Sequence, residues 1–141
     1  MTREEIDRRL VEHRAAFAHR DPDALAAGHA PAGTFQSPAA GLVHGREAIL
    51  EVYRFWYVAF PDFLLTWESP IIEPPRAAVF WTFDGVAAGP FFGEVKAGAH
   101  VKFAGAAEYE FGDEGIVSVR HIFDFSSVLV ATGVLKVKPA G

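Results

Sequence analysis

The chain contains no cysteine among its 141 residues. This absence excludes disulfides, thiolate metal sites and cysteine nucleophiles. The six histidines show neither His-x-His nor His-x-x-x-His spacing with a nearby acid, so we expect no metal site. The glycines form neither a dinucleotide-binding pattern nor a phosphate-binding loop, and we therefore expect no organic cofactor.

Positive charge is also scarce, because 13 Lys and Arg face 18 Asp and Glu for a net charge of −5. Without a basic patch, nucleic acid is not an expected partner. Apolar runs stay well short of the roughly 18 residues that a membrane-spanning helix needs. The start of the chain is polar and has no apolar core of a signal peptide. We expect a cytoplasmic protein without a membrane partner.

Phenylalanine, in contrast, is abundant, with 13 Phe beside three Trp. Hydrophobic residues make up 50% of the chain, and a small domain has limited interior for so many large side chains. This composition predicts an aromatic-lined pocket, a subunit interface, or both. We therefore predict a homodimer that associates through the outer face of its sheet.

Helical signals are concentrated in the first part of the chain. Thr2 and Glu5 form a capping box, which begins the first helix, and Pro61 closes the last one. A second start signal, an N-cap Asp followed by Pro, lies at residues 21–22. The predicted helices span residues 3–20, 22–27 and 45–60.

Strand signals dominate after Pro61, where runs rich in Val, Phe, Trp and Thr are separated by Gly and Pro. The predicted strands span residues 34–37, 63–69, 77–83, 100–111 and 116–125. Because the main strands follow the helices and do not alternate with them, the pattern predicts an α+β fold with an antiparallel sheet. We expect a single domain over residues 1–135 and a frayed tail over 136–141.

Several of these segments resemble the SnoaL-like polyketide cyclase family, which belongs to the NTF2-like superfamily. The similar segments, in order, are Gly45–Ile49, Phe60–Phe63, Gly89–Gly93, the hairpin at 112–116 and Phe123–Asp124. The resemblance implies an NTF2-like cone, in which three N-terminal helices pack on a curved antiparallel sheet and enclose a pocket. It also implies a homodimer and cofactor-free chemistry.

The same resemblance points to Asp124 as a catalytic base. In polyketide cyclases an aspartate near the end of the final strand removes a carbon-bound proton, and the enolate closes a ring by an aldol step. Asp124 stands between two phenylalanines, and burial there would raise its pKa toward the range that a base needs. The alternative is an ion pair with Arg120, four residues back on the same strand face. Arg120 could instead hold an anionic substrate oxygen.

Glu108 is the third catalytic candidate. Alternation places Glu108 and Glu110 on one strand face and Tyr109 and Phe111 on the other. Which face meets Asp124 depends on the register of the last hairpin, and a single bulge would reverse it. The alternative for the glutamates is a solvated position, since Glu is seldom buried.

Four aromatic residues are expected to contact the ligand, namely Phe35, Trp56, Phe60 and Trp81, although such residues also form ordinary cores. The histidines receive other interpretations. His121 faces away from Asp124 and is assigned to packing or to the surface, and His29 and His44 are assigned to loops. His13 lies on a helix without an evident partner.

Two functions of different classes remain open. The first is a cofactor-free enzyme, such as a polyketide cyclase, that acts on a small apolar carbonyl compound. The second is a non-catalytic module for ligand binding or dimerisation. Ketosteroid isomerases, which have a similar fold, carry a basic carboxylate just before a proline after the first strand. This chain has Ser37 before Pro38 there, which disfavours isomerisation by that route.

Overall fold

The computed structural model describes residues 1–138 as four helices and seven strands. The helices are α1 (Arg3–Ala18), α2 (Pro22–Ala27), α3 (Arg46–Ala59) and α4 (Phe125–Thr132). The strands are β1 (His29–Ser37), β2 (Gly41–His44), β3 (Leu64–Trp67), β4 (Ile71–Glu73), β5 (Arg76–Val86), β6 (His100–Gly112) and β7 (Gly115–Phe123). Part of the predicted tail, residues 139–141, lies outside the described residues.

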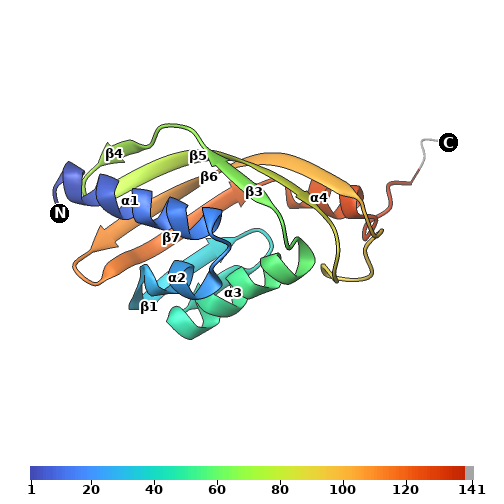
Figure 1. The fold of residues 1–141 in the computed structure, drawn as a ribbon, viewed down its shortest axis with the longest axis horizontal. Coiled ribbons are helices and arrows are strands. Elements are labelled where there is room, and N and C mark those ends of the chain that lie inside the picture. The colour runs from blue at the N-terminus through green and yellow to red at the C-terminus, as the bar shows by residue number, and fades with distance from the viewer. Residues whose placement is uncertain (139–141) are drawn as a thin grey trace.

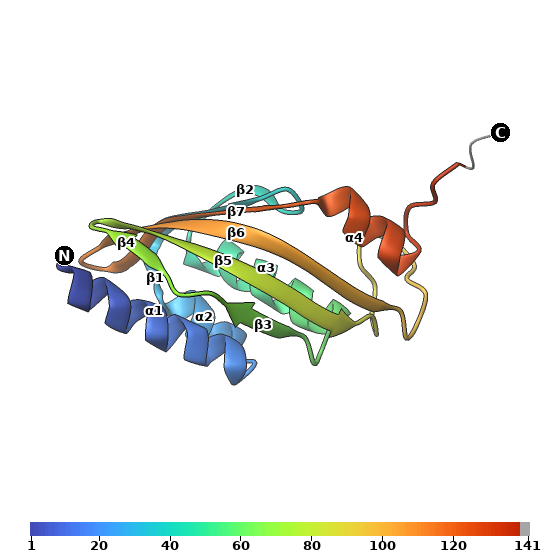
Figure 2. The ribbon, with the colours of Figure 1, turned by 90° about the horizontal axis from the view of Figure 1, so that it is seen from above.

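The strands form one curved sheet in the order β2-β1-β7-β6-β5-β3, with β4 paired to β5 (Figures 1 and 2). All neighbours are antiparallel except β1 and β7, which run parallel. The prediction of an antiparallel sheet is therefore wrong for this one pair. The two strands lie far apart in the sequence, and no local turn signal specifies their relative direction.

The three N-terminal helices pack on the sheet, which confirms the predicted α+β class and NTF2-like architecture (Figure 1). Helix α1 begins with the predicted capping box, in which Thr2 and Glu5 bond each other's backbone N–H. Helix α4 was not predicted. It begins directly after β7 and ends at Gly133, whose φ of 83° terminates the helix in the left-handed conformation.

Side-chain alternation decides which residues of the long strands face the helices. On β5 and β6 the odd-numbered residues point inward, and on β7 the same holds from Val119 onward. A register shift between Glu110 and Phe111 interrupts the last hairpin. Four aromatic residues among the inward-pointing ones, Trp81, Phe83, Phe103 and Phe123, form one wall of the space between sheet and helices.

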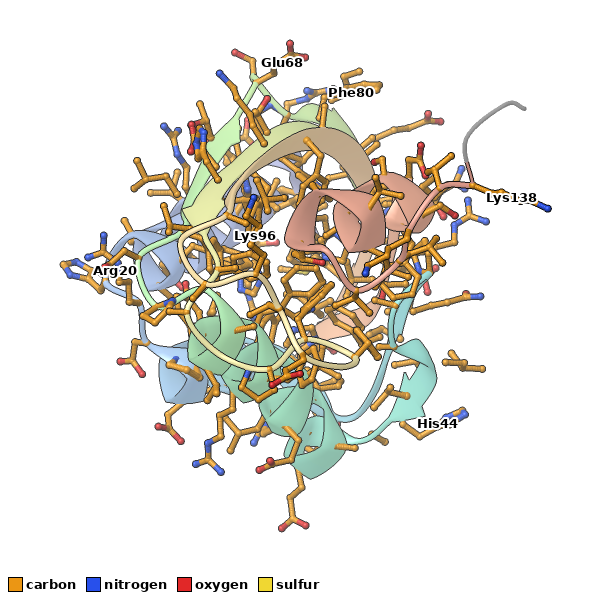
Figure 3. The ribbon with its side chains drawn as sticks, turned by 90° about the vertical axis from the view of Figure 1, so that its right-hand side faces the viewer. Arg20, His44, Glu68, Phe80, Lys96 and Lys138 are labelled. Atoms are coloured by element: carbon orange, nitrogen blue, oxygen red, sulfur yellow. The ribbon has the colours of Figure 1, made fainter. Side chains whose placement is uncertain are left out.

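The outer face of the sheet carries apolar side chains that residues 1–138 leave exposed. Phe80, Ala106 and Ile122 lie in one row across β5, β6 and β7. Phe80 is 50% exposed and Ile122 57% exposed, and Figure 3 shows Phe80 on this outer side. The row supports the predicted dimer through this face.

We expect light scattering at micromolar concentration to give the mass of a dimer. The variant Phe80→Glu should then give the mass of a monomer, because a carboxylate buried in this row would have no counter-charge and would lie beside Glu68, its cross-strand neighbour. Val11→Glu is the control for added charge, since Val11 is 60% exposed on α1, away from this face. A monomeric mass for the unaltered protein would contradict the expectation.

Candidate functional site

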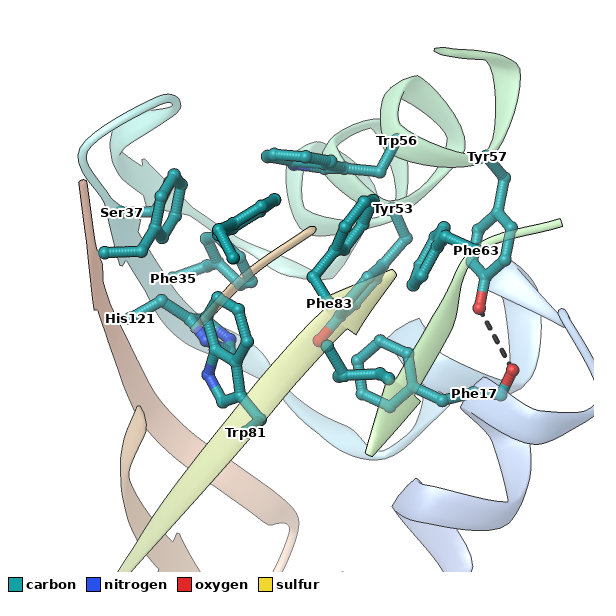
Figure 4. A pocket seen from close by; sticks show the side chains of 13 residues that line it. Phe17, Phe35, Ser37, Tyr53, Trp56, Tyr57, Phe63, Trp81, Phe83 and His121 are labelled. Carbon is teal, nitrogen blue, oxygen red and sulfur yellow. Dashed lines mark hydrogen bonds between the residues drawn. The ribbon is translucent and has the colours of Figure 1, made fainter. Parts of the chain in front are cut away.

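A narrow aromatic pocket lies between the concave face of the sheet and the helices (Figure 4). The pocket and its open mouth together contain about 530 Å³ of space outside the protein atoms. The lining residues are Phe17, Phe35, Ser37, Tyr53, Trp56, Tyr57, Phe63, Leu65, Trp81, Phe83, Phe103, His121 and Phe123. Such a space suits a flat or slender apolar molecule.

Three of the four predicted ligand-contacting aromatics line this pocket, namely Phe35, Trp56 and Trp81. The prediction that Phe60 contacts the ligand is wrong, because this residue is fully buried behind the pocket wall. Its ring stacks on Trp56 with 6.0 Å between ring centroids. Phe60 thus supports the wall without touching the cavity.

Trp81 depends on a glycine for its position. The indole lies across Gly105 of the neighbouring strand and reaches toward His121 and Phe123, with ring centroids 5.8 Å and 5.9 Å away. A Cβ atom at position 105 would lie 2.5 Å from Cζ2 and 2.6 Å from Cη2 of Trp81. Only glycine leaves room for the ring in this orientation.

Replacing Gly105 with Ala is expected to destabilise the protein by about 1–3 kcal/mol, because the added methyl group overpacks the wall. The thermal midpoint should fall by several degrees, and the fluorescence of Trp81 should change as its ring moves. In the background Trp81→Phe, which lacks both clashing atoms, the same substitution should cost less. Equal costs in the two backgrounds would contradict this account.

His121 is the one basic side chain that lines the pocket within residues 1–138. Its ring packs between Phe35, at 5.2 Å, and Trp81, at 5.8 Å between centroids. Burial lowers the pKa of His121 to about 4, so the imidazole is neutral near pH 7. The sequence interpretation of His121 as packing or surface overlooked its access to the pocket, although it does face away from Asp124.

Two other polar groups lie in the same wall. The indole Nε1 of Trp81 is buried and has no hydrogen-bond partner among the described residues. Ser37 stands one step beyond the register pair Gln36 and Arg120, and so lies next to His121. Its Oγ accepts a hydrogen bond from the N–H of Ala40 at 2.9 Å. A ligand that carries oxygen could therefore be bound by donors on this side of the pocket.

Asp124 does not lie in the pocket, contrary to the sequence-based expectation. It follows β7 directly, is exposed, and forms the N-cap of α4. Its Oδ1 accepts a hydrogen bond from the N–H of Ser127 at 3.1 Å. The predicted strand was two residues too long, and the capping preference of Asp explains why the chain turns into a helix here.

Arg120 and Glu108 also lie outside the pocket, on the outer face of the sheet. They are cross-strand neighbours whose Nη2 and Oε1 atoms are 3.8 Å apart, with side chains 54% and 50% exposed. The predicted pair of Arg120 with Asp124 is therefore replaced by a pair with Glu108. An exposed pair of this kind contributes only about 0–1 kcal/mol.

Next to the pocket lies a group of buried polar side chains that was not predicted from the sequence. His29 is fully buried at the start of β1, and its Nε2 shares a hydrogen bond of 2.7 Å with the hydroxyl of Tyr53. His13 is buried beside it, with ring centroids 5.7 Å apart, and neither ring nitrogen of His13 has a partner in the described chain. Burial lowers the pKa of His29 to about 4 and that of His13 well below its usual value. The loop assignment of His29 is wrong, because β1 begins five residues earlier than predicted.

The family model of the SnoaL-like polyketide cyclases matches residues 8–131. The chain belongs to the SnoaL-like polyketide cyclase family. This confirms the resemblance seen in the sequence, and the match covers every element from the middle of α1 to the end of α4. No significant match is found among curated proteins.

Solved structures show the same fold at low sequence identity. AclR from Streptomyces galilaeus, named as a candidate hydroxylase, is 23% identical with a TM-score of 0.82, over 98% of this chain and 87% of its own. A candidate SnoaL-like polyketide cyclase from Jannaschia sp. CCS1 is 17% identical with a TM-score of 0.81, over 92% of both chains. An NTF2-like protein from Burkholderia pseudomallei K96243 is 18% identical with a TM-score of 0.74, over 89% of this chain and 95% of its own. These likenesses support the fold, and their differing names show that the fold does not specify one reaction.

None of the helices within residues 1–138 is both long and apolar enough to cross a membrane. Nor do residues 1–138 group three His, Asp or Glu side chains so that they could hold a metal ion.

Proposed function

We propose that the protein binds an apolar carbonyl compound in the aromatic pocket and removes a proton from the carbon next to the carbonyl, without a cofactor. The observation that carries the proposal is a basic side chain, His121, in the wall of a pocket that is otherwise almost wholly apolar. The polyketide cyclases of the family provide the chemical precedent. The proposal also includes the ring closure that follows removal of the proton.

The proton transfer uses groups that are present in the wall. The free ring nitrogen of His121 takes the proton, and the electrons of the broken C–H bond form the enolate. The enolate carbon then attacks a second carbonyl carbon of the same molecule, and the new alkoxide takes the proton back from the imidazolium. Trp81 and Ser37 are the hydrogen-bond donors in the same wall that could stabilise developing negative charge on oxygen.

The low pKa of His121 is compatible with this role. A base with a pKa of about 4 is already in its free form at neutral pH, although it is intrinsically weak. In ketosteroid isomerases, an aspartate of pKa about 4.6 removes a proton next to a carbonyl because donors stabilise the enolate oxygen. His121 therefore needs such donors in order to be effective.

Exchange of carbon-bound protons for deuterium tests the proposal without knowledge of the natural substrate. 1-Tetralone is a flat bicyclic ketone with an acidic CH₂ group beside its carbonyl. In D₂O with a chelator present, the protein should accelerate loss of this CH₂ signal in the proton NMR spectrum, and the rate should saturate with ketone concentration. Binding of 1-tetralone without any acceleration would instead support the non-catalytic module.

A further inference from the structure

The hydrogen bond between His29 and Tyr53 gives the pocket a second polar feature. The two side chains come from β1 and α3 and are both buried, and the Nε2 and hydroxyl oxygen atoms are 2.7 Å apart. Tyr53 is also one of the residues that line the pocket. Figure 4 shows its ring reaching from α3 toward the inner end of the pocket, with the hydroxyl oxygen at its tip.

The position of the proton on His29 decides what Tyr53 can do. A neutral imidazole carries one hydrogen, and the Nδ1 atom of His29 is buried without a partner within the described residues. A hydrogen on Nδ1 would leave that buried N–H without a partner, and His29 does not line the pocket, so a ligand there would not pair it. A hydrogen on Nε2 is donated to the oxygen of Tyr53 and leaves the Tyr53 hydroxyl as the unpaired donor, which a molecule in the pocket can accept because Tyr53 lines it. A ligand with an oxygen acceptor therefore favours the tautomer with its hydrogen on Nε2.

This tautomer leaves the hydroxyl hydrogen of Tyr53 free. Among residues 1–138, His29 is the only hydrogen-bond partner of the Tyr53 hydroxyl, so no protein acceptor pairs with the hydroxyl hydrogen. Tyr57 provides the contrast in the same pocket, since its hydroxyl donates to the carbonyl oxygen of Phe17 at 3.1 Å. Burial also raises the pKa of Tyr53 well above its usual value, so the group stays a donor at neutral pH.

We propose that the Tyr53 hydroxyl donates a hydrogen bond to an oxygen of the bound ligand, and that His29 is the positioning residue that orients this hydroxyl. The inference rests on the proposed function, because it concerns a ligand in the same pocket. It identifies the ligand as one with an oxygen acceptor that can reach the inner end of the pocket. The rest of that ligand is apolar, as the lining requires.

Binding of a matched pair of probes tests the inference. 1-Tetralone carries the ketone oxygen, whereas tetralin has the same bicyclic carbon skeleton without it. Quenching of tryptophan fluorescence gives both dissociation constants, because Trp56 and Trp81 line the pocket. We expect Tyr53→Phe to weaken binding of 1-tetralone about three- to tenfold and to leave tetralin nearly unchanged, which corresponds to one net hydrogen bond.

Two comparisons separate this role from ordinary packing. Tyr57→Phe removes a hydroxyl from the same pocket that is already used, so any effect on affinity should be the same for both probes. His29→Leu should reduce the preference for the ketone, whereas His29→Gln, whose amide can still donate to Tyr53, should restore it. A packing defect alone would weaken both probes equally and would not distinguish Gln from Leu.

Each outcome decides between the proposals. A ketone preference that disappears in Tyr53→Phe supports the inference. If both probes bind and the preference for the ketone survives in Tyr53→Phe, the inference alone is overturned. The same holds if both probes bind the unaltered protein equally well. Failure of both probes to bind the unaltered protein overturns the proposed function and this inference with it.

Discussion

Replacing His121 with Gln is expected to slow deuterium exchange of 1-tetralone by about 10²–10⁴-fold, the usual contribution of a general base. Gln retains a polar group of similar length but cannot accept the proton. The dissociation constant of the ketone should change little, because the aromatic lining remains in place. Proton NMR measures the exchange rate, and tryptophan fluorescence measures the binding in the same samples.

Asp124→Asn is the control that distinguishes His121, the base proposed from the structure, from Asp124, the base expected from the sequence. Asp124 is exposed and caps α4, and Asn caps helices about as well as Asp. We therefore expect an unchanged exchange rate and an unchanged thermal midpoint. Loss of exchange in Asp124→Asn with normal exchange in His121→Gln would reverse the assignment of the base.

Acid is expected to destabilise the protein strongly between pH 6.5 and pH 4. The pKa of a histidine is about 6.5 in the unfolded chain, but burial lowers the pKa values of His29 and His121 to about 4. In this window the unfolded state binds more protons than the folded state, so the free energy of unfolding falls as the pH falls. The stability is fully present above pH 6.5 and is lost on approach to pH 4.

The expected loss is about 3 kcal/mol for each of these two histidines at pH 4. Such a loss is a large fraction of the roughly 5–15 kcal/mol that stabilises a typical domain. Urea unfolding at pH 8, 6, 5 and 4 measures it. A free energy of unfolding that stays constant from pH 7 to pH 4 would contradict the burial of neutral histidines.

His13→Leu should reduce this sensitivity to acid. Both ring nitrogens of His13 are buried without partners in the part of the chain described, and Leu fills similar space without polar atoms. We expect a gain of about 1–3 kcal/mol from removal of an unpaired polar group, and a larger gain at pH 5 than at pH 8. His44→Leu is the matched control at an exposed histidine (Figure 3). Destabilisation by His13→Leu at pH 8 would contradict unpaired ring nitrogens, and an equal effect at both pH values would contradict the lowered pKa of His13.

The placement of His121 in the pocket wall could have been read from the sequence of β7 with a different emphasis. Arg120 and Asp124 share one side of the alternation, whereas Val119, His121 and Phe123 share the other. Charged residues belong on the solvated face, so the second set should have been expected inside. The family resemblance instead drew attention to Asp124, which directly follows Phe123, the last residue of β7 that faces the pocket.

Other parts of the site carried no signal in the sequence. Tyr53 and His29 lie 24 residues apart on a helix and a strand, and nothing in their local patterns predicts a hydrogen bond between them. Gly105 lies inside a strand, and the indole of Trp81 together with the backbone oxygen of Ile122 explains the absence of a side chain. Contacts of this kind depend on how elements pack and on the register between strands.

Local interactions made the class of this fold predictable from sequence alone. The capping box at Thr2, the N-cap at Asp21 and the stop at Pro61 involve residues within one helical turn of each other, so they mark the helices without any tertiary context. Alternation likewise placed Glu108 and Tyr109 on opposite faces of β6, as the structure shows. The tertiary structure alone decided that β1 pairs with β7 in parallel, because this pairing joins residues distant in sequence. That pairing brings Phe35 and Ser37 beside His121 in the cavity wall, whereas the capping of α4 leaves Asp124 in water.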